Sequence, residues 1–100
     1  MGIEMSQQAL ISIIAEIISL FRESDDVIHL RQFEELYSWA KDAKSTEDQS
    51  SLARLILRLY GGMGSFNDTI ICRNGIIDKS ATSKLNKLRD RLFETARNLL

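Results

Sequence analysis

The feature that most constrains the fold is the apolar run ALISIIAEIISLF, residues 9–21. Its large side chains recur at the i, i+3, i+4, i+7 spacing of one helix face, not in the alternation of a strand. The run is too short to span a bilayer, and Glu16 lies near its middle. It also lacks the basic start and the small-residue cleavage site of a signal peptide. The pattern therefore predicts a core helix over about residues 6–23.

Three later segments show the same helical spacing, and the chain contains no proline to interrupt them. We predict helices over about residues 27–43, from about residue 46 to 59, and from about residue 80 to the C-terminal end. Short polar side chains can cap the first turn of two of them, with Asp25 or Asp26 before the second helix and Ser45 or Thr46 before the third. The last helix is predicted to start near Ser80 or Thr82. One hundred residues suffice for one modest core, so we predict a single domain over residues 1–100, a compact all-α bundle of four main helices.

The core of this bundle is predicted from the apolar face of each helix. The predicted core residues are Leu10, Ile13, Ile14, Ile17, Leu20, Phe21, Leu30, Phe33, Leu36, Tyr37, Ala40, Leu52, Leu55, Ile56, Leu59, Leu85, Leu88, Leu92, Ala96 and Leu99. Trp39 lies off the apolar face of its helix. Two interpretations are open for it: it closes one edge of the core, or it is an aromatic anchor of an interface.

Four of the five glycines fall in one stretch, LYGGMGSFNDTIICRNG, residues 59–75. We interpret it as a corner between helices, in which Gly61 or Gly62 ends the third helix in a left-handed conformation. Ser65 and Asp68 have the spacing of a capping box, which predicts a short helix over about residues 66–73. The alternative is a small hairpin turning at Asn74-Gly75. We favour the helix because a lone hairpin of this size has little stability.

The sequence shows no strong signature of catalysis, cofactor binding or metal binding. The glycine stretch has no lysine followed by Ser or Thr, as a phosphate-binding loop needs, and it follows a predicted helix where a dinucleotide site needs a strand. With one histidine and one cysteine, the chain cannot form a usual zinc site or an internal disulfide. We interpret Cys72 as a buried apolar residue and His29 as structural or exposed, with a Cys72–His29 nucleophilic pair as the weaker alternative. The cysteine usage favours the cytoplasm.

Charge is distributed unevenly along the chain. Residues 1–50 carry ten acids and four bases, net −6, whereas residues 51–100 carry nine bases and four acids, net +5. Such a dipole can steer a charged partner at long range. The alternative is that the two halves neutralise each other within the fold or in a homodimer.

The segment LYGGMGSFNDTIIC resembles a motif shared by small uncharacterised bacterial helical proteins: an aromatic residue, Gly-Gly-Met-Gly-Ser, an apolar residue and Asn-Asp. The resemblance is close over residues 59–71 and loose over the last helix. It implies a helical fold and no particular chemistry.

In its length, acidic face and missing catalytic residues, the chain also resembles bacterial immunity proteins of the contact-dependent growth inhibition type. That resemblance implies a cytoplasmic protein that is not an enzyme and that binds and neutralises a cognate toxin domain, often a nuclease. The residues we expect to bind the toxin are Glu23, Asp25, Asp26, Glu34, Glu35, Trp39 and Asp42.

Two other functions stay open. The basic second half could serve a regulatory or nucleic-acid-associated protein, although no aromatic residues interleave with its bases. The residues that would carry that function are Arg54, Arg58, Lys84, Lys87 and Arg91. A small enzyme or ligand-binding protein centred on Asn67, Asp68 and Arg73 is the less favoured alternative.

Overall fold

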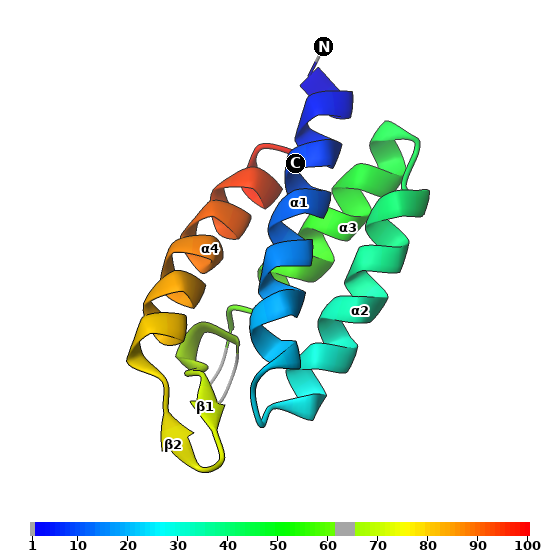
Figure 1. Ribbon diagram of the computed structural model, residues 1–100. Coiled ribbons are helices and arrows are strands. Elements are labelled where there is room, and N and C mark those ends of the chain that lie inside the picture. The colour runs from blue at the N-terminus through cyan, green and yellow to red at the C-terminus, as the bar shows by residue number, and fades with distance from the viewer. Residues whose placement is uncertain (1, 62–65) are drawn as a thin grey trace.

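The computed structural model describes residues 2–61 and 66–100, with side chains from Gln7 onward. Over these residues, four α-helices form an elongated bundle with a β-hairpin at one end (Figure 1). The helices are α1 (Gly2–Arg22), α2 (Val27–Asp42), α3 (Thr46–Arg58) and α4 (Lys79–Arg97). A single 3₁₀ turn, η1 (Phe66–Asp68), and the strands β1 (Cys72–Arg73) and β2 (Ile76–Ile77) lie between α3 and α4. The predicted all-α bundle of four main helices is confirmed.

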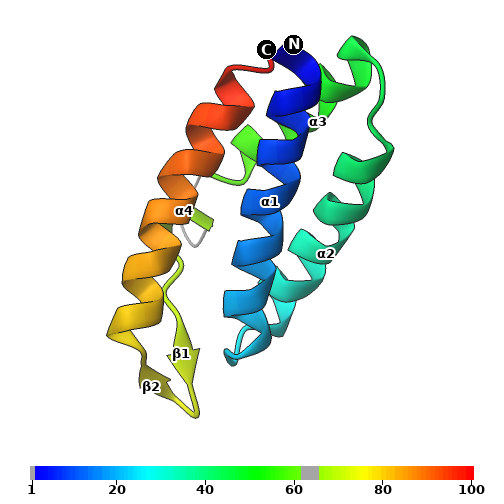
Figure 2. The same cartoon turned by 45° about the horizontal axis from the view of Figure 1, so that its top comes forward.

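Helix α1 lies between α2 and α4 and packs on both, while α3 packs mainly on α4 (Figure 2). This position explains why α1 carries the most apolar sequence. Of its predicted core face, Leu10, Ile13, Ile14, Ile17 and Phe21 are all at most 1% exposed. The predicted seam of α4 is buried along its whole length. The periodicity therefore identified the core of these two helices correctly except at Leu20, which is half-buried.

Short polar caps begin three of the helices, as expected from their unpaired first-turn amides. Asp26 accepts a hydrogen bond from the amide of His29, and Ser45 accepts one from Asp48. The last helix, predicted to start near Ser80 or Thr82, starts at Lys79. Asp78 caps it by accepting a hydrogen bond from the amide of Ala81.

The short helix predicted over residues 66–73 is wrong beyond Asp68, and the alternative hairpin is right. Strands β1 and β2 pair antiparallel, with Cys72 opposite Ile77 and Arg73 opposite Ile76. The turn uses Asn74 and Gly75 at φ 53° and 78°, the left-handed pair typical of a type I′ hairpin turn. This hairpin is not isolated, because the amide of Asp25 donates to the Cys72 carbonyl at 2.8 Å. The objection that a lone hairpin is unstable therefore does not apply.

The prediction that a glycine ends α3 in a left-handed conformation is wrong for Gly61. Among the described residues only Asn74 and Gly75 have a positive φ, so Gly61 does not end α3 in a left-handed conformation. The amide of Gly61 instead donates to the Arg58 carbonyl at 3.3 Å, which continues the last turn of the helix. Gly62 and Ser65, the other residues of the predicted helix end and capping box, lie outside the described residues.

Phe66 and Arg89 hold residues 66–69, which precede the hairpin, against the helices. Phe66 is 2% exposed, and its ring lies 4.8 Å from that of Phe33 and 5.5 Å from that of Tyr60. The buried guanidinium of Arg89 donates to the carbonyls of Phe66 at 2.6 Å and Thr69 at 2.9 Å. Arg89 supplies hydrogen bonds to backbone carbonyls within residues 66–69, and Phe66 anchors the same residues in the apolar core.

Candidate protein-binding site on α2 and α3

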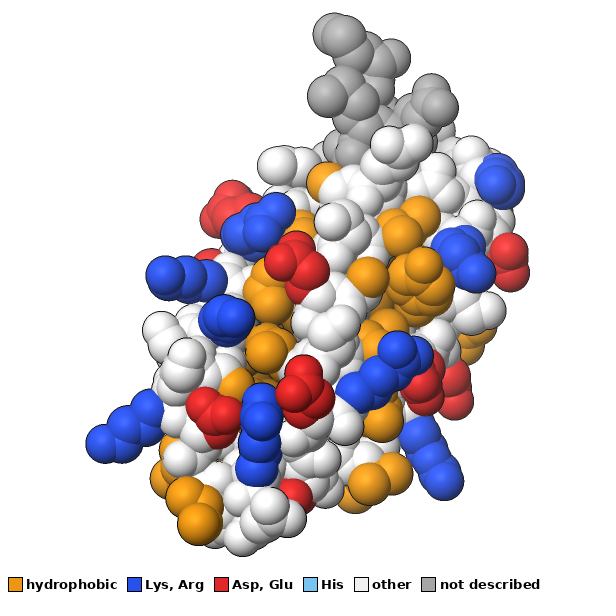
Figure 3. Space-filling view, in the orientation of Figure 1, with side chains coloured by type: hydrophobic (Ala, Val, Ile, Leu, Met, Phe, Trp, Pro, Cys, Tyr) orange, Lys and Arg blue, Asp and Glu red, His pale blue; other side chains and the backbone are white. Residues whose placement is uncertain are grey.

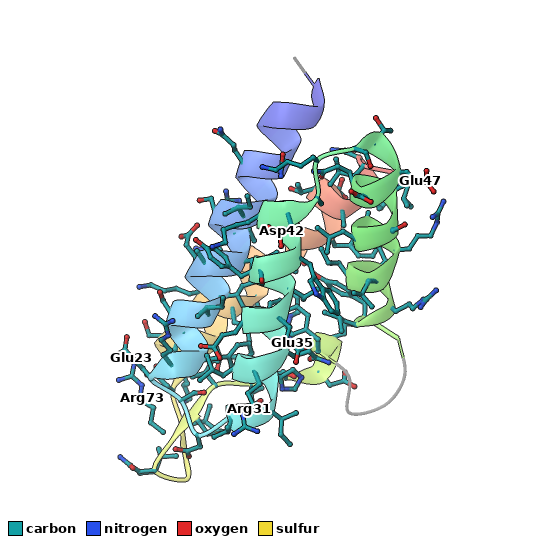
Figure 4. All side chains as sticks on the ribbon, turned by 90° about the vertical axis from the view of Figure 1, so that its right-hand side faces the viewer. Glu23, Arg31, Glu35, Asp42, Glu47 and Arg73 are labelled. Carbon is teal, nitrogen blue, oxygen red and sulfur yellow. The ribbon has the colours of Figure 1, made fainter. Side chains whose placement is uncertain are left out.

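The outer surface of α2 carries three of the predicted partner-binding residues on one stripe. Glu35, Trp39 and Asp42 are spaced by four and three residues, so they lie on the same face of the helix. All three are exposed, and Trp39 is 49% exposed. In Figure 4 Glu35 and Asp42 project from the same side of α2. Neither carboxylate forms an ion pair with another described residue.

Beside this stripe, a groove of about 300 Å³ runs between α2 and α3. Its lining residues are Trp39, Asp42, Ala43, Asp48, Ser51, Leu52 and Leu55. Leu52 and Ala43 are buried and form an apolar floor, while Leu55 is half-buried. Among the described residues that line it, the only charged ones are the acids Asp42 and Asp48. We call this feature the α2–α3 groove. It combines an apolar floor, an aromatic wall and an acidic rim.

Glu23 and Glu34, which were also predicted to bind a partner, face bases of the same chain. Glu23 lies 3.4 Å from Arg73 of the hairpin, and the two are adjacent in Figure 4. Glu34 lies 3.7 Å from Arg22 at the end of α1. Exposed pairs of this kind contribute only about 0–1 kcal/mol, so a partner could displace them at small cost.

Asp25 and Asp26 have internal roles. The Asp25 carboxylate accepts from the amides of Asn74 at 2.9 Å and Gly75 at 2.8 Å, which fastens the hairpin to the turn between α1 and α2. Asp26 caps α2, and its other oxygen lies 2.6 Å from Nδ1 of His29. The carboxylate oxygens of Asp25 and Asp26 are therefore already engaged within the fold. Among the predicted acids, Glu35 and Asp42 are the two that form no ion pair or capping contact with a described residue, and they lie beside Trp39.

The hydrogen bonds from Gly75 and Asn74 lower the pKa of Asp25 below its ordinary value of 3.8. A lowered pKa means that the contribution of Asp25 to stability is complete above its unfolded pKa, and is lost as pH falls through the lowered folded value. We therefore expect the NMR amide shifts of Asn74 and Gly75 to titrate together with a midpoint below 3.8.

Asp25→Asn should abolish this titration and weaken the protection of both amides against hydrogen exchange at neutral pH. Glu23→Gln, which removes only an exposed ion pair beside the same hairpin, should leave both unchanged. A wild-type midpoint at or above 3.8 would refute the role of Asp25 as the anchor of the hairpin.

His29 and Cys72 do not form a nucleophilic pair in this arrangement. The two ring nitrogens of His29 face the Asp26 carboxylate and, at 3.4 Å, the hydroxyl of Thr69. The His29 ring stacks on Phe21 with centroids 5.5 Å apart. Cys72 is half-buried in β1, so it is less buried than predicted. His29 is structural, as expected.

Arg89 is buried and Tyr60 is half-buried, and sequence reasoning singled out neither of them. Burial lowers the pKa of Arg89, against the opposing effects of Tyr60, Asp90 and Asp68. Burial likewise raises the pKa of Tyr60 well above its ordinary value, and the nearby Arg89 charge opposes the rise. The Tyr60 hydroxyl donates to the Arg89 carbonyl at 2.6 Å. Arg89 is thus a fixed internal cation and not part of a basic surface.

The five bases predicted for a regulatory or nucleic-acid-associated function are exposed but dispersed over two helices. Arg54 and Arg58 lie on α3, and Lys84, Lys87 and Arg91 lie on α4. Arg91 faces Glu16 of α1 at 3.9 Å, and acids and bases are interspersed over the α1–α4 face (Figure 3). The charge asymmetry of the sequence is thus partly neutralised within the fold on this face.

No cluster of metal-ligating side chains and no helix able to cross a membrane occurs among the described residues. Residues 29–76 match the model of a protein family described as a domain of unknown function, DUF6966. The match runs from α2 into β2, so it contains the whole α2–α3 groove and the glycine-rich stretch, but not α1 or α4. No curated protein and no solved structure matches the chain.

Proposed function

We propose that the protein is an immunity protein that binds and neutralises a bacterial toxin domain, through the acidic outer face of α2 and the adjoining part of α3. The observation that supports this most is the division of the acids. Asp25, Asp26 and Asp78 are engaged in holding the fold, whereas Glu35 and Asp42 flank an exposed tryptophan and have no described ion-pair partner. Unpaired carboxylates around an aromatic anchor suit recognition better than they suit stability.

The partner that this surface fits best is a nuclease toxin acting in the cytoplasm. The substrate groove of a nuclease is basic because it must attract phosphates. Carboxylates spaced along a rigid helix can take the place of those phosphates and block the groove. Trp39 would supply the desolvated contact that dominates the affinity of many interfaces.

Neutralisation is tested with the gene that lies next to the one for this chain. We expect that gene to encode a toxin domain whose expression stops growth, and we expect co-expression of this protein to restore growth. The purified pair should form a stable complex. An adjacent product that is harmless, or a toxin that kills equally well in the presence of this protein, would disprove the proposal.

The charge of the α2 face is tested by reversal. Glu35→Lys with Asp42→Lys should slow association with the toxin domain by about tenfold or more at low salt, because like charges then oppose each other across the interface. The matched control is Glu16→Lys with Glu94→Lys, which changes net charge equally on the α1–α4 side. Stopped-flow rates across a salt series give the comparison. If both double variants slow association equally, the effect belongs to net charge and not to this surface.

A further inference from the structure

The α2–α3 groove has a shape and a polarity that define what it can hold. Its volume of about 300 Å³ is at the lower limit of ligand pockets, so it suits one large side chain better than a whole cofactor. Trp39 forms a wall, and Leu55 stays partly in contact with water. An apolar side chain entering here would remove both surfaces from solvent, which is favourable in proportion to the area buried.

The acidic residues at the opening of the α2–α3 groove determine which residues can flank that side chain in the partner. Asp42 ends α2, and Asp48 lies in the first turn of α3, so the two carboxylates stand on opposite sides of the α2–α3 connection. Both are exposed, and neither forms an ion pair with a described residue. A guanidinium or ammonium group beside the apolar side chain would meet them, whereas a carboxylate would be repelled.

We infer that the α2–α3 groove receives one large aliphatic or aromatic side chain of the protein partner, flanked in the partner by Lys or Arg. This inference rests on the proposed function and specifies the chemistry of the partner at that surface. The groove receives the apolar side chain of the partner, and the acidic rim favours a side chain that has basic neighbours.

A second copy of the chain is a poorer occupant. The hairpin presents the exposed residues Ile76 and Ile77 with Lys79 nearby, but it lies at the opposite end of the bundle from the α2–α3 connection (Figure 1). A hairpin seated in the groove of another copy would be a head-to-tail contact. Unless the rotation closes a ring, such contacts produce open chains of copies. The open-ended geometry of that contact therefore favours a different protein as the occupant, and the acidic rim requires that protein to be basic.

Trp39 provides the readout, because it is the only tryptophan of the sequence and lines the groove. The probe is an amphipathic helical peptide made of Leu and Lys. Two matched peptides carry Glu in place of every Lys, or Ser in place of every Leu. We expect a saturable blue shift of Trp39 emission with the Leu–Lys peptide, and at least about tenfold weaker binding of the other two. No saturable shift up to about 1 mM, or an equal shift with the Leu–Glu peptide, would overturn the inference.

Variants locate the effect. Asp42→Asn with Asp48→Asn should weaken binding of the Leu–Lys peptide by about tenfold, while Glu16→Gln with Glu94→Gln on the α1–α4 side should not. Equal weakening by both pairs would also overturn the inference. Sedimentation of the protein alone should show a monomer, and a concentration-dependent blue shift without peptide would assign the groove to a second copy. Because the peptides need no toxin, failure of the groove to bind them is distinguishable from failure of the growth assay.

Discussion

Replacing Phe66 by alanine is expected to lower the free energy of unfolding by about 3–5 kcal/mol, the cost usual for removing a buried aromatic side chain. Phe66 is 2% exposed and lies among the rings of Phe21, Phe33 and Tyr60. Those rings belong to α1, to α2 and to the end of α3, so no single helix could close the cavity. Urea unfolding followed by circular dichroism measures the change.

The matched control is Ile70→Ala, four residues further along the chain. A helix over residues 66–73 would place Phe66 and Ile70 on the same face, and both would then be costly to remove. In the structure Ile70 is 46% exposed, so its replacement should cost less than about 1 kcal/mol. Similar losses for the two variants would contradict the fold described between α3 and α4.

Arg89→Met is expected to destabilise the protein by about 2–4 kcal/mol. Methionine keeps much of the apolar stem but leaves the carbonyls of Phe66 and Thr69 without their charged donor, and each unsatisfied buried group costs about 1–3 kcal/mol. The Arg89 guanidinium also lies 5.5 Å from the centre of the Phe66 ring, a favourable contact that would be lost.

The control for Arg89 is Arg91→Met, two residues along the same helix. Arg91 is exposed, and its only described ion pair is with Glu16 at 3.9 Å, so its loss should change stability by less than about 0.5 kcal/mol. Melting curves of the two variants and the wild type give the comparison. If the melting temperature of Arg89→Met equalled that of the wild type, Arg89 would not be the residue that holds residues 66–69 in place.

The helices could be predicted because their information is local. The apolar spacing of α1 and α4 and the capping side chains Asp26 and Ser45 all lie within a few residues of the elements that they specify. The hairpin could not be chosen over a short helix on the same basis. Its anchor is Asp25, whose carboxylate reaches Asn74 and Gly75 across 49 and 50 positions of sequence.

The part of the candidate site that lies on α2 was predictable, because its information is also local in sequence. Helical spacing alone places Trp39 outside the apolar face of α2, and this position predicts that its side chain is exposed. Sequence alone could not tell the structural acid Asp25 from the free acid Glu35, since both are carboxylates in polar surroundings. The α3 side of the groove, with Asp48 and Leu55, could have been found only from the short connection that folds α3 back along α2.

We propose that α2 and α3 form the binding surface and that the hairpin and α4 do not. The most direct test is an NMR titration of the isotope-labelled protein with the toxin domain that we expect the adjacent gene to encode. We expect the amide shift changes to concentrate in residues 35–55, with residues 71–78 and the exposed bases of α4 little affected. Shift changes centred on Lys84, Lys87 and Arg91, or on the hairpin, would contradict the account and place recognition on a different surface.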